Sequence, residues 1–362
     1  MNKKTVWVVL KGSVAHLPPV MSLLQVLLEK SDYKVAFIST AKSQLKGPAG
    51  KFTEFINTTP TSRNPLLKAW QYLSFRYFAI RTLEQHATAS DTVWYASLDT
   101  ALALWGSSIF QRFAYILQLH ELYDTHPRRL SMIAPMARRA KEVVVPEINR
   151  AGILQVWLGL QRRPTVIPNK PYHHPRQRFM EPTTELTRKT LQKCKTDKSV
   201  ILYQGHIGGD RNLLPLAEAM KALPDCELWL MGQDHGFVDS LLKISSNIRY
   251  LGYIPAPLHL EITSHASIGV MTYDAVNLNN LYCAPNKLWE YTGFSMPFIA
   301  NKTPPLELVA ATMQAGACIE FEAEEIINCI TNTCNNLETL RKFASNFYES
   351  EDITTPILRA VH

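Results

Sequence analysis

The 362-residue sequence lacks the features that mark membrane-spanning or exported chains. It has no run of about 18 uncharged apolar residues, the length that a membrane-spanning helix requires. Its start is basic, but only five apolar residues precede Lys11, too few for the core of a signal peptide. It also has no internal repeat and no low-complexity tract. These absences, with 46% hydrophobic and 19% charged residues, predict a globular cytoplasmic protein.

Paired cysteines and paired acidic residues of the metal-binding kind are missing as well. No two of the six cysteines form a C-x-x-C pair, and no D-x-D motif occurs. The cysteines lie in apolar segments, which predicts buried thiols in a reducing compartment. They are Cys194, Cys226, Cys283, Cys318, Cys329 and Cys334.

Acidic residues are scarce in one half of the chain only. Residues 1–168 contain 21 Lys and Arg against 10 Asp and Glu, a net charge of +11. Residues 169–362 contain 17 against 21, a net charge of −4. The first half therefore favours an anionic partner such as nucleic acid, a membrane surface or a phosphorylated acceptor, although solvated surface charge also fits.

Short apolar runs alternate with helical patterns along most of the chain, which predicts α/β structure with parallel sheets covered on both faces. The pattern restarts near residue 199 after a Pro-rich stretch, so we expect two doubly wound, Rossmann-like domains facing each other across a cleft. The expected domains are 1–168 and 169–344, with a helix at about 345–362 packing back on the first. The expected strands are 5–10, 34–39, 92–96, 113–119, 142–146, 199–205, 227–232, 248–253, 266–272 and 297–300.

The segment YQGHIGGDRNLLPLAEAM (203–220) combines a strand, a Gly-containing loop and a helix expected to begin near Arg211. Glycines such as Gly205 allow close backbone approach to a ligand, and a helix N-terminus attracts anions. The guanidinium of Arg211 suits phosphate. An ordinary strand–helix turn also fits, because the spacing matches neither a Walker loop nor a dinucleotide fingerprint.

A similar turn, KGSVAHLPP (11–19), places Gly12 directly after the first strand and before a helix expected at Pro18. In APNKLWEYTGFSMPFIA (284–300), the carboxylate Glu290 falls near the start of a helix that follows a strand and a polar loop. A carboxylate at such a place can accept hydrogen bonds from a vicinal diol such as ribose. Arg211 and Glu290 together predict a nucleotide-diphosphate site.

Two of these segments, GHIGGDRNL (205–213) and PNKLWEYTGFSMPFIA (285–300), resemble the donor-domain motifs of family 4-type glycosyltransferases, which have the GT-B fold. HELYD (120–124), VVVP (143–146) and VIPNK (166–170) follow the order of that family. By this resemblance Arg211 binds the donor diphosphate and Glu290 the ribose, Gly12 lies near the phosphates, and His120 lies near the transferred sugar. The donor-binding set is Gly12, Gly205, His206, Arg211, Tyr282, Asn286, Lys287, Leu288 and Glu290, with Arg211, His120 and Glu290 as catalytic residues.

The sequence departs from the family at two positions. His206 stands where the family's loop has an arginine, and Tyr282 stands where the family has the first of two glutamates. That glutamate contacts the donor sugar, and Asn279, Asn280 and Tyr282 are the alternatives here. A satisfied buried histidine is likewise an alternative for His120.

The resemblance implies retaining sugar transfer from a nucleotide-diphosphate sugar to an acceptor hydroxyl, with no bound metal or cofactor. The acceptor is expected to be lipid-linked or a polysaccharide of the cell surface. Two other classes remain open: a nucleotide-sugar epimerase of the same fold, and a basic nucleic-acid-binding protein.

The segment 63–86 carries an apolar helical face with two interpretations, core packing or contact with an anionic membrane. A cluster of basic residues on a later segment would extend a surface that contacts an anionic membrane. We therefore expect peripheral contact with the inner membrane. The face is formed by Leu66, Trp70, Leu73, Tyr77 and Ile80, and the basic group by Arg128, Arg129, Arg138 and Arg139.

Overall fold

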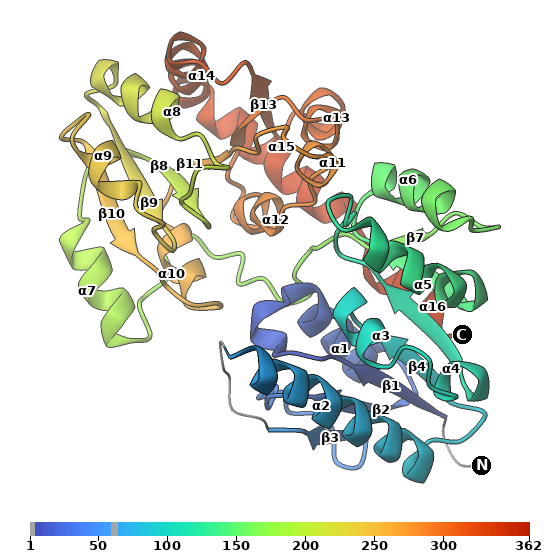
Figure 1. Ribbon diagram of the computed structural model, residues 1–362. Coiled ribbons are helices and arrows are strands. Elements are labelled where there is room, and N and C mark those ends of the chain that lie inside the picture. Colours follow the sequence, from blue (N-terminus) through green and yellow to red (C-terminus); the bar gives the residue numbers. More distant parts are fainter. Residues whose placement is uncertain (1–3, 59–63) are drawn as a thin grey trace. The chain divides into compact units, whose positions relative to one another are not determined.

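The computed structural model describes residues 4–58 and 64–362, which divide into two compact units (Figure 1). The first unit contains Met1–Tyr172 and Asp352–His362, and the second contains His173–Glu351. Each unit has its own sheet with helices on both faces. Arg63, the first residue of the basic and aromatic segment, lies outside the described residues.

The first unit is built on a seven-stranded sheet of order β3-β2-β1-β4-β5-β6-β7, and every strand pair in it is parallel. β1 is paired with β2 on one side and β4 on the other, so the chain reverses its winding direction between β1 and β4. The strands are β1 (Thr5–Val9), β2 (Lys34–Ser39), β3 (Phe52–Ile56), β4 (Thr92–Tyr95), β5 (Ala114–Gln118), β6 (Glu142–Val145) and β7 (Thr165–Val166).

Local sequence explains where the helices of this unit begin and end. Prolines occupy the first turn of α1, where no backbone N–H partner is lost. The side chain of Asn64 caps α2 by accepting from the amide of Leu66 at 2.9 Å. The helices are η1 (Val14–His16), α1 (Pro18–Lys30), α2 (Pro65–His86), α3 (Leu98–Ala103), α4 (Ile109–Arg112), α5 (Pro127–Arg139), α6 (Ile148–Leu158) and α16 (Thr354–Val361).

The second unit has a six-stranded, all-parallel sheet of order β10-β9-β8-β11-β12-β13, so its winding reverses between β8 and β11. Its strands are β8 (Ser199–Gln204), β9 (Cys226–Met231), β10 (Ile248–Gly252), β11 (Ile268–Met271), β12 (Phe298–Asn301) and β13 (Gly316–Ile319). Its helices are α7 (Glu185–Lys193), α8 (Leu214–Ala219), η2 (Met220–Ala222), α9 (Val238–Leu242), α10 (His259–Thr263), α11 (Leu278–Leu281), α12 (Asn286–Gly293), α13 (Pro304–Met313), α14 (Ala323–Asn335) and α15 (Leu337–Ser350).

Burial of both sheet faces explains why the strand sequences are unbroken apolar runs. The second sheet is covered by two separate clusters, one with Leu202 and Trp229 and the other with Ile201 and Leu228. Because neighbouring residues of one strand point to opposite faces, both faces of that sheet are buried. In the first unit, α16 packs on α1 and adds Ile353, Ile357, Ala360 and Val361 to the core.

The ten expected strands are present, each within two residues of its expected bounds, and the α/β class is confirmed. Three strands were not predicted: β3, β7 and β13. All three lie at sheet edges and are only half-buried, so their sequences do not form apolar runs. The segment returning to the first unit begins at Asp352, later than the expected 345, because α15 belongs to the second unit.

One expected helix start is wrong, and the structure contradicts one of the two open interpretations of segment 63–86. The helix expected to begin near Arg211 begins at Leu214, with Pro215 in its first turn. The apolar face of α2 is not a core face, because the helix buries Phe75, Ala79 and Leu83 on its opposite side. Within residues 4–58 and 64–362, no helix combines the length and the apolar character needed to cross a membrane.

Candidate functional site

The candidate site lies at the carboxyl ends of β8 and β11, the point where the second sheet reverses its winding. Ligands of open α/β sheets bind outside the carboxyl ends of the strands at such a switch point. Gly205 follows β8 directly, and Tyr273 follows β11 by two residues. The loop after β8 carries Arg211, and α12 carries Lys287 and Glu290.

Glycines allow two backbone loops and one side chain to approach closely here. Gly205 has a φ of 121°, and its amide donates to the carbonyl of Met231 at 2.8 Å. A Cβ on Gly205 would lie 3.0 Å from Cε of Lys287, and one on Gly232 would lie 1.7 Å from the carbonyl oxygen of Gly205. The loops after β8 and β9 therefore pack backbone against backbone, and Lys287 packs against the first of them.

Arg211 lies in the turn before α8, where its amide donates to the carbonyl of Gly208 at 3.0 Å. Its Nη1 donates to the carbonyl oxygen of Asp210 at 2.7 Å and to Oδ2 of Asp210 at 2.6 Å. The guanidinium stacks over the ring of Tyr273 at 4.6 Å, and the side chain is 15% exposed. Nη2 and Nε make no hydrogen bond to any described residue, so one edge of the fork remains for a ligand.

Lys287 is the second cation of the site and stands between two aromatic rings. Its Nζ lies 4.4 Å from the ring centre of Tyr203 and 5.6 Å from that of Tyr273. Burial, reinforced by the neighbouring charge of Arg211, lowers the pKa of Lys287 to about 7. An anion bound beside Arg211 and Lys287 would relieve the repulsion between them.

Glu290 is the buried carboxylate of the site, with 7% of its surface exposed. Its Oε2 accepts a hydrogen bond from Nε2 of Gln204, and its Oε1 lies 3.3 Å from Nε2 of His259. Burial by itself would raise the pKa of Glu290, but His259, and to a lesser extent His174 and Lys287, outweigh burial and lower it. The carboxylate is therefore held in its charged form, in the second turn of α12 rather than in the first.

The other predicted donor-site residues of the second unit differ from one another in their surroundings. His206 is half-exposed, its ring centre lies 4.2 Å from that of His235 with the two rings tilted, and its Nε2 lies 3.2 Å from Oδ1 of Asp210. Asn286 opens α12, and the side chain of Leu288 lies in the hydrophobic core. Tyr282 is half-buried just after α11.

Of the three alternatives for the sugar contact, Asn280 makes hydrogen bonds within its own loop. Nδ2 of Asn280 donates to the carbonyl of Asp274 at 3.0 Å, and its amide is capped by Asn277. Asn280 therefore holds the loop after β11 together.

In the first unit, Gly12 and His120 lie at the carboxyl ends of strands, after β1 and β5. Gly12 follows β1 with a φ of 154°, a conformation that favours glycine. His120 is 9% exposed, and its Nε2 donates to the carbonyl of Ala96 at 2.9 Å. Burial lowers the pKa of His120, so the ring is neutral, and Arg150 donates to its backbone carbonyl. These contacts match a satisfied buried histidine, and a sugar contact remains a prediction.

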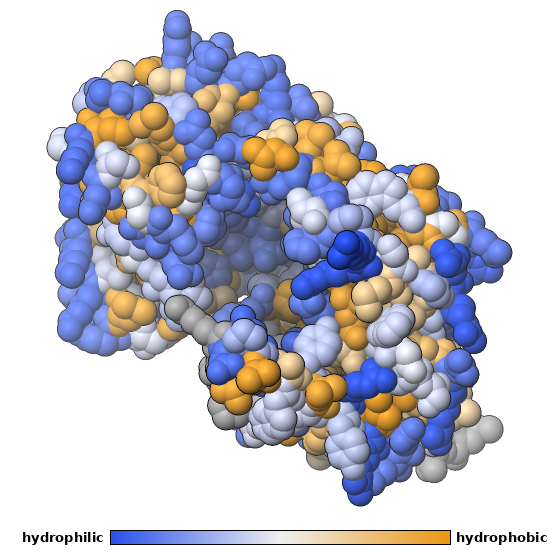
Figure 2. Space-filling model, in the orientation of Figure 1, coloured by the Kyte–Doolittle hydropathy of each residue, from blue (hydrophilic) through white to orange (hydrophobic). Residues whose placement is uncertain are grey.

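The four predicted basic residues and the apolar face of α2 lie on the surface of the first unit. Arg129 pairs with Asp99 at 3.3 Å, and Arg138 donates to the carbonyl of Leu158 at 3.1 Å. Figure 2 shows hydrophobic and intermediate surface over α2 with strongly hydrophilic residues beside it. The exposed fractions on α2 are 80% for Leu66, 53% for Trp70, 64% for Leu73 and 64% for Tyr77.

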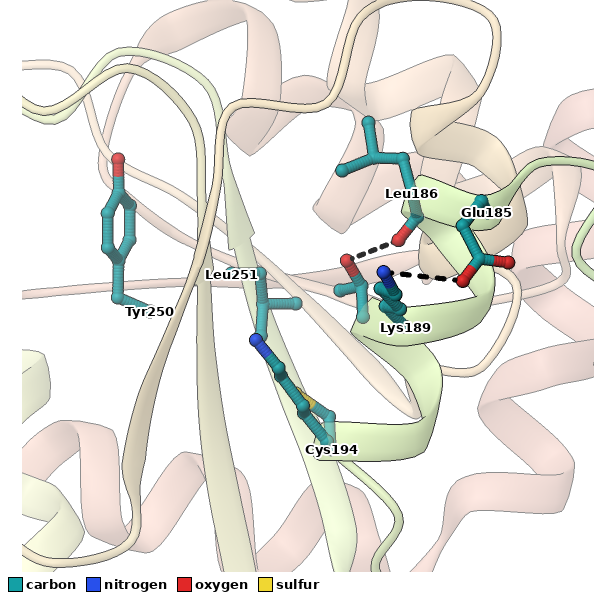
Figure 3. Close-up of a pocket in the computed structure, with 8 residues that line it drawn as sticks. Glu185, Leu186, Lys189, Cys194, Tyr250 and Leu251 are labelled. Atoms are coloured by element: carbon teal, nitrogen blue, oxygen red, sulfur yellow. Dashed lines mark hydrogen bonds and ion pairs between the residues drawn. The ribbon is translucent and has the colours of Figure 1, made fainter.

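A groove between α7 and β10 is the pocket drawn in Figure 3. Lys189 pairs with Glu185 at 3.4 Å across its rim, and Leu186, Leu251 and Cys194 line it. It lies at the edge strand of the second sheet, two strands away from β8, so it is separate from the switch point. Among the described residues, no group of three or more His, Cys, Asp or Glu is placed to hold a metal ion.

Four residues of the site were not predicted from the sequence: Tyr203, Gln204, His259 and Tyr273. Gln204 carried a weak signal, because it is a polar residue that closes an otherwise apolar strand. His259 and Tyr273 carried none, since their roles depend on α10 and on the loop after β11 folding against the same strand end.

No protein-family model matches the sequence, and no curated protein matches it by sequence. Solved structures do match. HepE from Anabaena, in complex with UDP and glucose, has a TM-score of 0.68 and 14% identity, over 99% of this chain and 98% of its own. A glycosyltransferase from Rickettsia africae ESF-5 has a TM-score of 0.67 and 15% identity, over 100% and 95%.

A putative UDP-N-acetylglucosamine 2-epimerase from Listeria monocytogenes also matches, with a TM-score of 0.60 and 14% identity, over 100% of this chain and 96% of its own. Likenesses at these identities establish the fold. The chain has the GT-B fold, with two doubly wound Rossmann-like units, as the resemblance predicted.

Proposed function

We propose that the protein is a glycosyltransferase that moves a sugar from a nucleotide-diphosphate sugar to an acceptor hydroxyl. The observation that carries this proposal is the cluster at the β8–β11 switch point. Two cations, Arg211 and Lys287, lie there beside a glycine-lined strand end, and a buried, ionised Glu290 lies on the same helix as Lys287.

Each group of the cluster meets one demand of the reaction. The diphosphate gains negative charge as the glycosidic bond breaks, and preorganised cations stabilise that charge. Arg211 and Lys287 supply this positive charge, and the backbone at Gly205 allows the phosphates to approach closely. Glu290 accepts hydrogen bonds from the ribose hydroxyls. We propose retention of the anomeric configuration and no requirement for a metal or cofactor.

Two structural relatives support the class of donor and of product. HepE has been crystallised with UDP, with UDP and glucose, and with UDP-glucose. WaaG, at 14% identity and a TM-score of 0.60, is described as a glycosyltransferase of lipopolysaccharide biosynthesis. These descriptions favour a UDP-sugar as the first donor to test and a cell-surface glycan as the product.

For the acceptor, we propose a lipid-linked or polysaccharide molecule reached from the cytoplasmic face of the inner membrane. The support is the exposed apolar face of α2 together with the basic residues of α5, which has no acidic residue. Such a surface binds anionic lipid through apolar contact and charge. In this proposal the protein is peripheral and binds no nucleic acid.

The experiment that tests the proposed function is a screen of nucleotide sugars for hydrolysis and transfer, combined with calorimetric binding of UDP, GDP, dTDP and ADP. We expect one nucleotide to bind and its sugar to be released or transferred, with no loss of activity in EDTA. Interconversion of the sugar without release of nucleotide would instead identify an epimerase. Tight binding of single-stranded RNA with no nucleotide binding would identify a nucleic-acid-binding protein.

A further inference from the structure

Residues of two other elements converge on Glu290, which is carried by α12. Gln204 comes from the end of β8, and His259 and Thr263 come from the short helix α10. Gln204 and Thr263 are 4% and 0% exposed, and the side chain of His259 is 14% exposed. Burying polar groups costs free energy unless they are paired, so a network assembled from three elements needs a reason.

The Gln204 amide lies between Thr263 and Glu290. The hydroxyl of Thr263 has two acceptors, Oε1 of Gln204 at 2.6 Å and the carbonyl of His259 at 2.9 Å. The carboxylate of Glu290 is held in its charged form and can only accept, so the amide nitrogen of Gln204 points toward it and donates to Oε2. In this orientation Gln204 offers Glu290 a donor, which suits a charged carboxylate and disfavours a protonated one.

The orientation of His259 is set by Glu290 itself. Nε2 of the ring lies 3.3 Å from Oε1 of Glu290, whereas Nδ1 is buried with no hydrogen-bond partner. The imidazole therefore carries a proton on Nε2 and points it at the carboxylate. Among the hydrogen bonds and ion pairs of the described residues, Glu290 is the one partner of this ring.

The geometry points to His259 and Gln204 as positioning residues for nucleotide recognition, a role that rests on the proposed function. An ionised carboxylate has about four lone-pair positions. Gln204 and His259 each occupy one from the protein side, so two remain for the two hydroxyls of a ribose. We propose that the pair holds Glu290 charged and in the rotamer that accepts a vicinal diol, and thereby makes the site selective for ribose over deoxyribose.

The test compares the affinity of nucleotides that differ by one hydroxyl. The probes are the pairs UDP and 2′-deoxy-UDP, GDP and 2′-deoxy-GDP, and ADP and 2′-deoxy-ADP. In the unaltered protein we expect the hydroxyl to strengthen binding about tenfold, the scale of one hydrogen bond to a charged group. In His259→Leu we expect that ratio to fall to about one.

A double-mutant cycle shows whether His259 acts through Glu290. His259→Leu should weaken nucleotide binding in the unaltered background and have little further effect in Glu290→Gln. His259→Gln, which retains an N–H donor, should recover part of the hydroxyl selectivity. His265→Leu is the matched control, because His265 follows α10 closely but bonds to the carbonyl of Met180 and not to Glu290.

The outcomes separate this inference from the proposed function. If no nucleotide of any pair binds the unaltered protein, the proposed function fails, and the positioning role fails with it. If the unaltered protein selects for the hydroxyl and folded His259→Leu and His259→Gln select equally well, only the positioning role is wrong. Equal effects of His259→Leu with and without Glu290→Gln also overturn it, because His259 would then act independently.

Discussion

Each unit winds its sheet outward from a central pair of strands, β1 and β4 in the first and β8 and β11 in the second. The use of charge differs between them. In the second unit, cations and a carboxylate are gathered and largely buried at the switch point, where Arg211 is 15% exposed and Glu290 is 7% exposed. In the first unit the excess of positive charge lies on surface helices such as α5.

On the same topology, the two arrangements of charge suit two different kinds of ligand. Buried charges bind a small ligand with defined geometry, because low exposure strengthens each electrostatic contact. Exposed charges act collectively on a large anionic surface and are weakened by salt. Mutations in each unit can test whether the second unit binds a small ligand and the first binds an anionic surface.

The largest effect should come from removing a buried cation. Arg211→Ala should lower kcat by about two to three orders of magnitude, the scale for loss of one group that stabilises transition-state charge. Circular dichroism should show an unchanged fold, since Arg211 lies in a turn.

Arg188→Ala is the matched control, because Arg188 is an exposed arginine of the same unit, paired with Glu185 on α7. It should leave kcat unchanged. Comparable losses in both variants would mean that the buried cluster has no special role.

The surface charges should matter for membranes and not for nucleotides. Replacing Arg128, Arg129, Arg138 and Arg139 by Ser should weaken binding to vesicles with anionic lipid by about tenfold or more, because each basic residue near such a surface contributes roughly 1 kcal/mol. Binding of the unaltered protein should weaken as salt increases, and nucleotide affinity of the variant should be unchanged. Equal binding to neutral and anionic vesicles would contradict this role.

Variants on the two sides of α2 test whether its apolar face binds lipid or packs against protein. Trp70→Ser combined with Leu73→Ser should reduce vesicle binding several-fold at unchanged thermal stability, since both side chains are exposed. Phe75→Ser, on the buried side of the same helix, should instead destabilise the protein by about 3–5 kcal/mol. A large loss of stability in the Trp70 and Leu73 variant would show that this face packs against protein.

Donor affinity should depend on pH through Lys287. Its pKa is about 7 in the unliganded protein, and an adjacent diphosphate must raise it. Affinity for a nucleotide sugar should therefore be constant below about pH 7 and decrease by up to about tenfold per pH unit above it. Calorimetry across pH 6–9 measures this, and Lys287→Met should flatten the profile.

The smallest effect concerns the stability cost of the same lysine. Because its pKa is lower in the folded protein than the ordinary 10.5, the unfolded chain binds more protons between about pH 7 and 10.5. The stability of the folded protein therefore increases with pH over that window. Lys287→Met should raise Tm at pH 7 by about 2–4 °C while lowering activity. A lower Tm would show that Lys287 contributes net stability.

The sequence predicted the layout well because buried parallel strands leave apolar runs, and β1, β8 and β9 were found that way. It identified Arg211, Lys287 and Glu290 because they lie in short motifs next to strand ends. It did not identify His259, whose role arises only when α10 packs beside β8, some fifty residues away in the chain. It also left α2 ambiguous, because an apolar stripe has the same spacing whether it faces a core or a lipid.

The return of the chain to the first unit affects how the protein is made. Ile353, Ile357, Ala360 and Val361 complete a core whose other members include residues of β1, β2 and α1. During synthesis these four residues are added only after the whole second unit has been translated. The core of the first unit therefore stays incomplete for the time needed to add the more than 170 residues of the second unit, about 10–35 s at ordinary rates of synthesis.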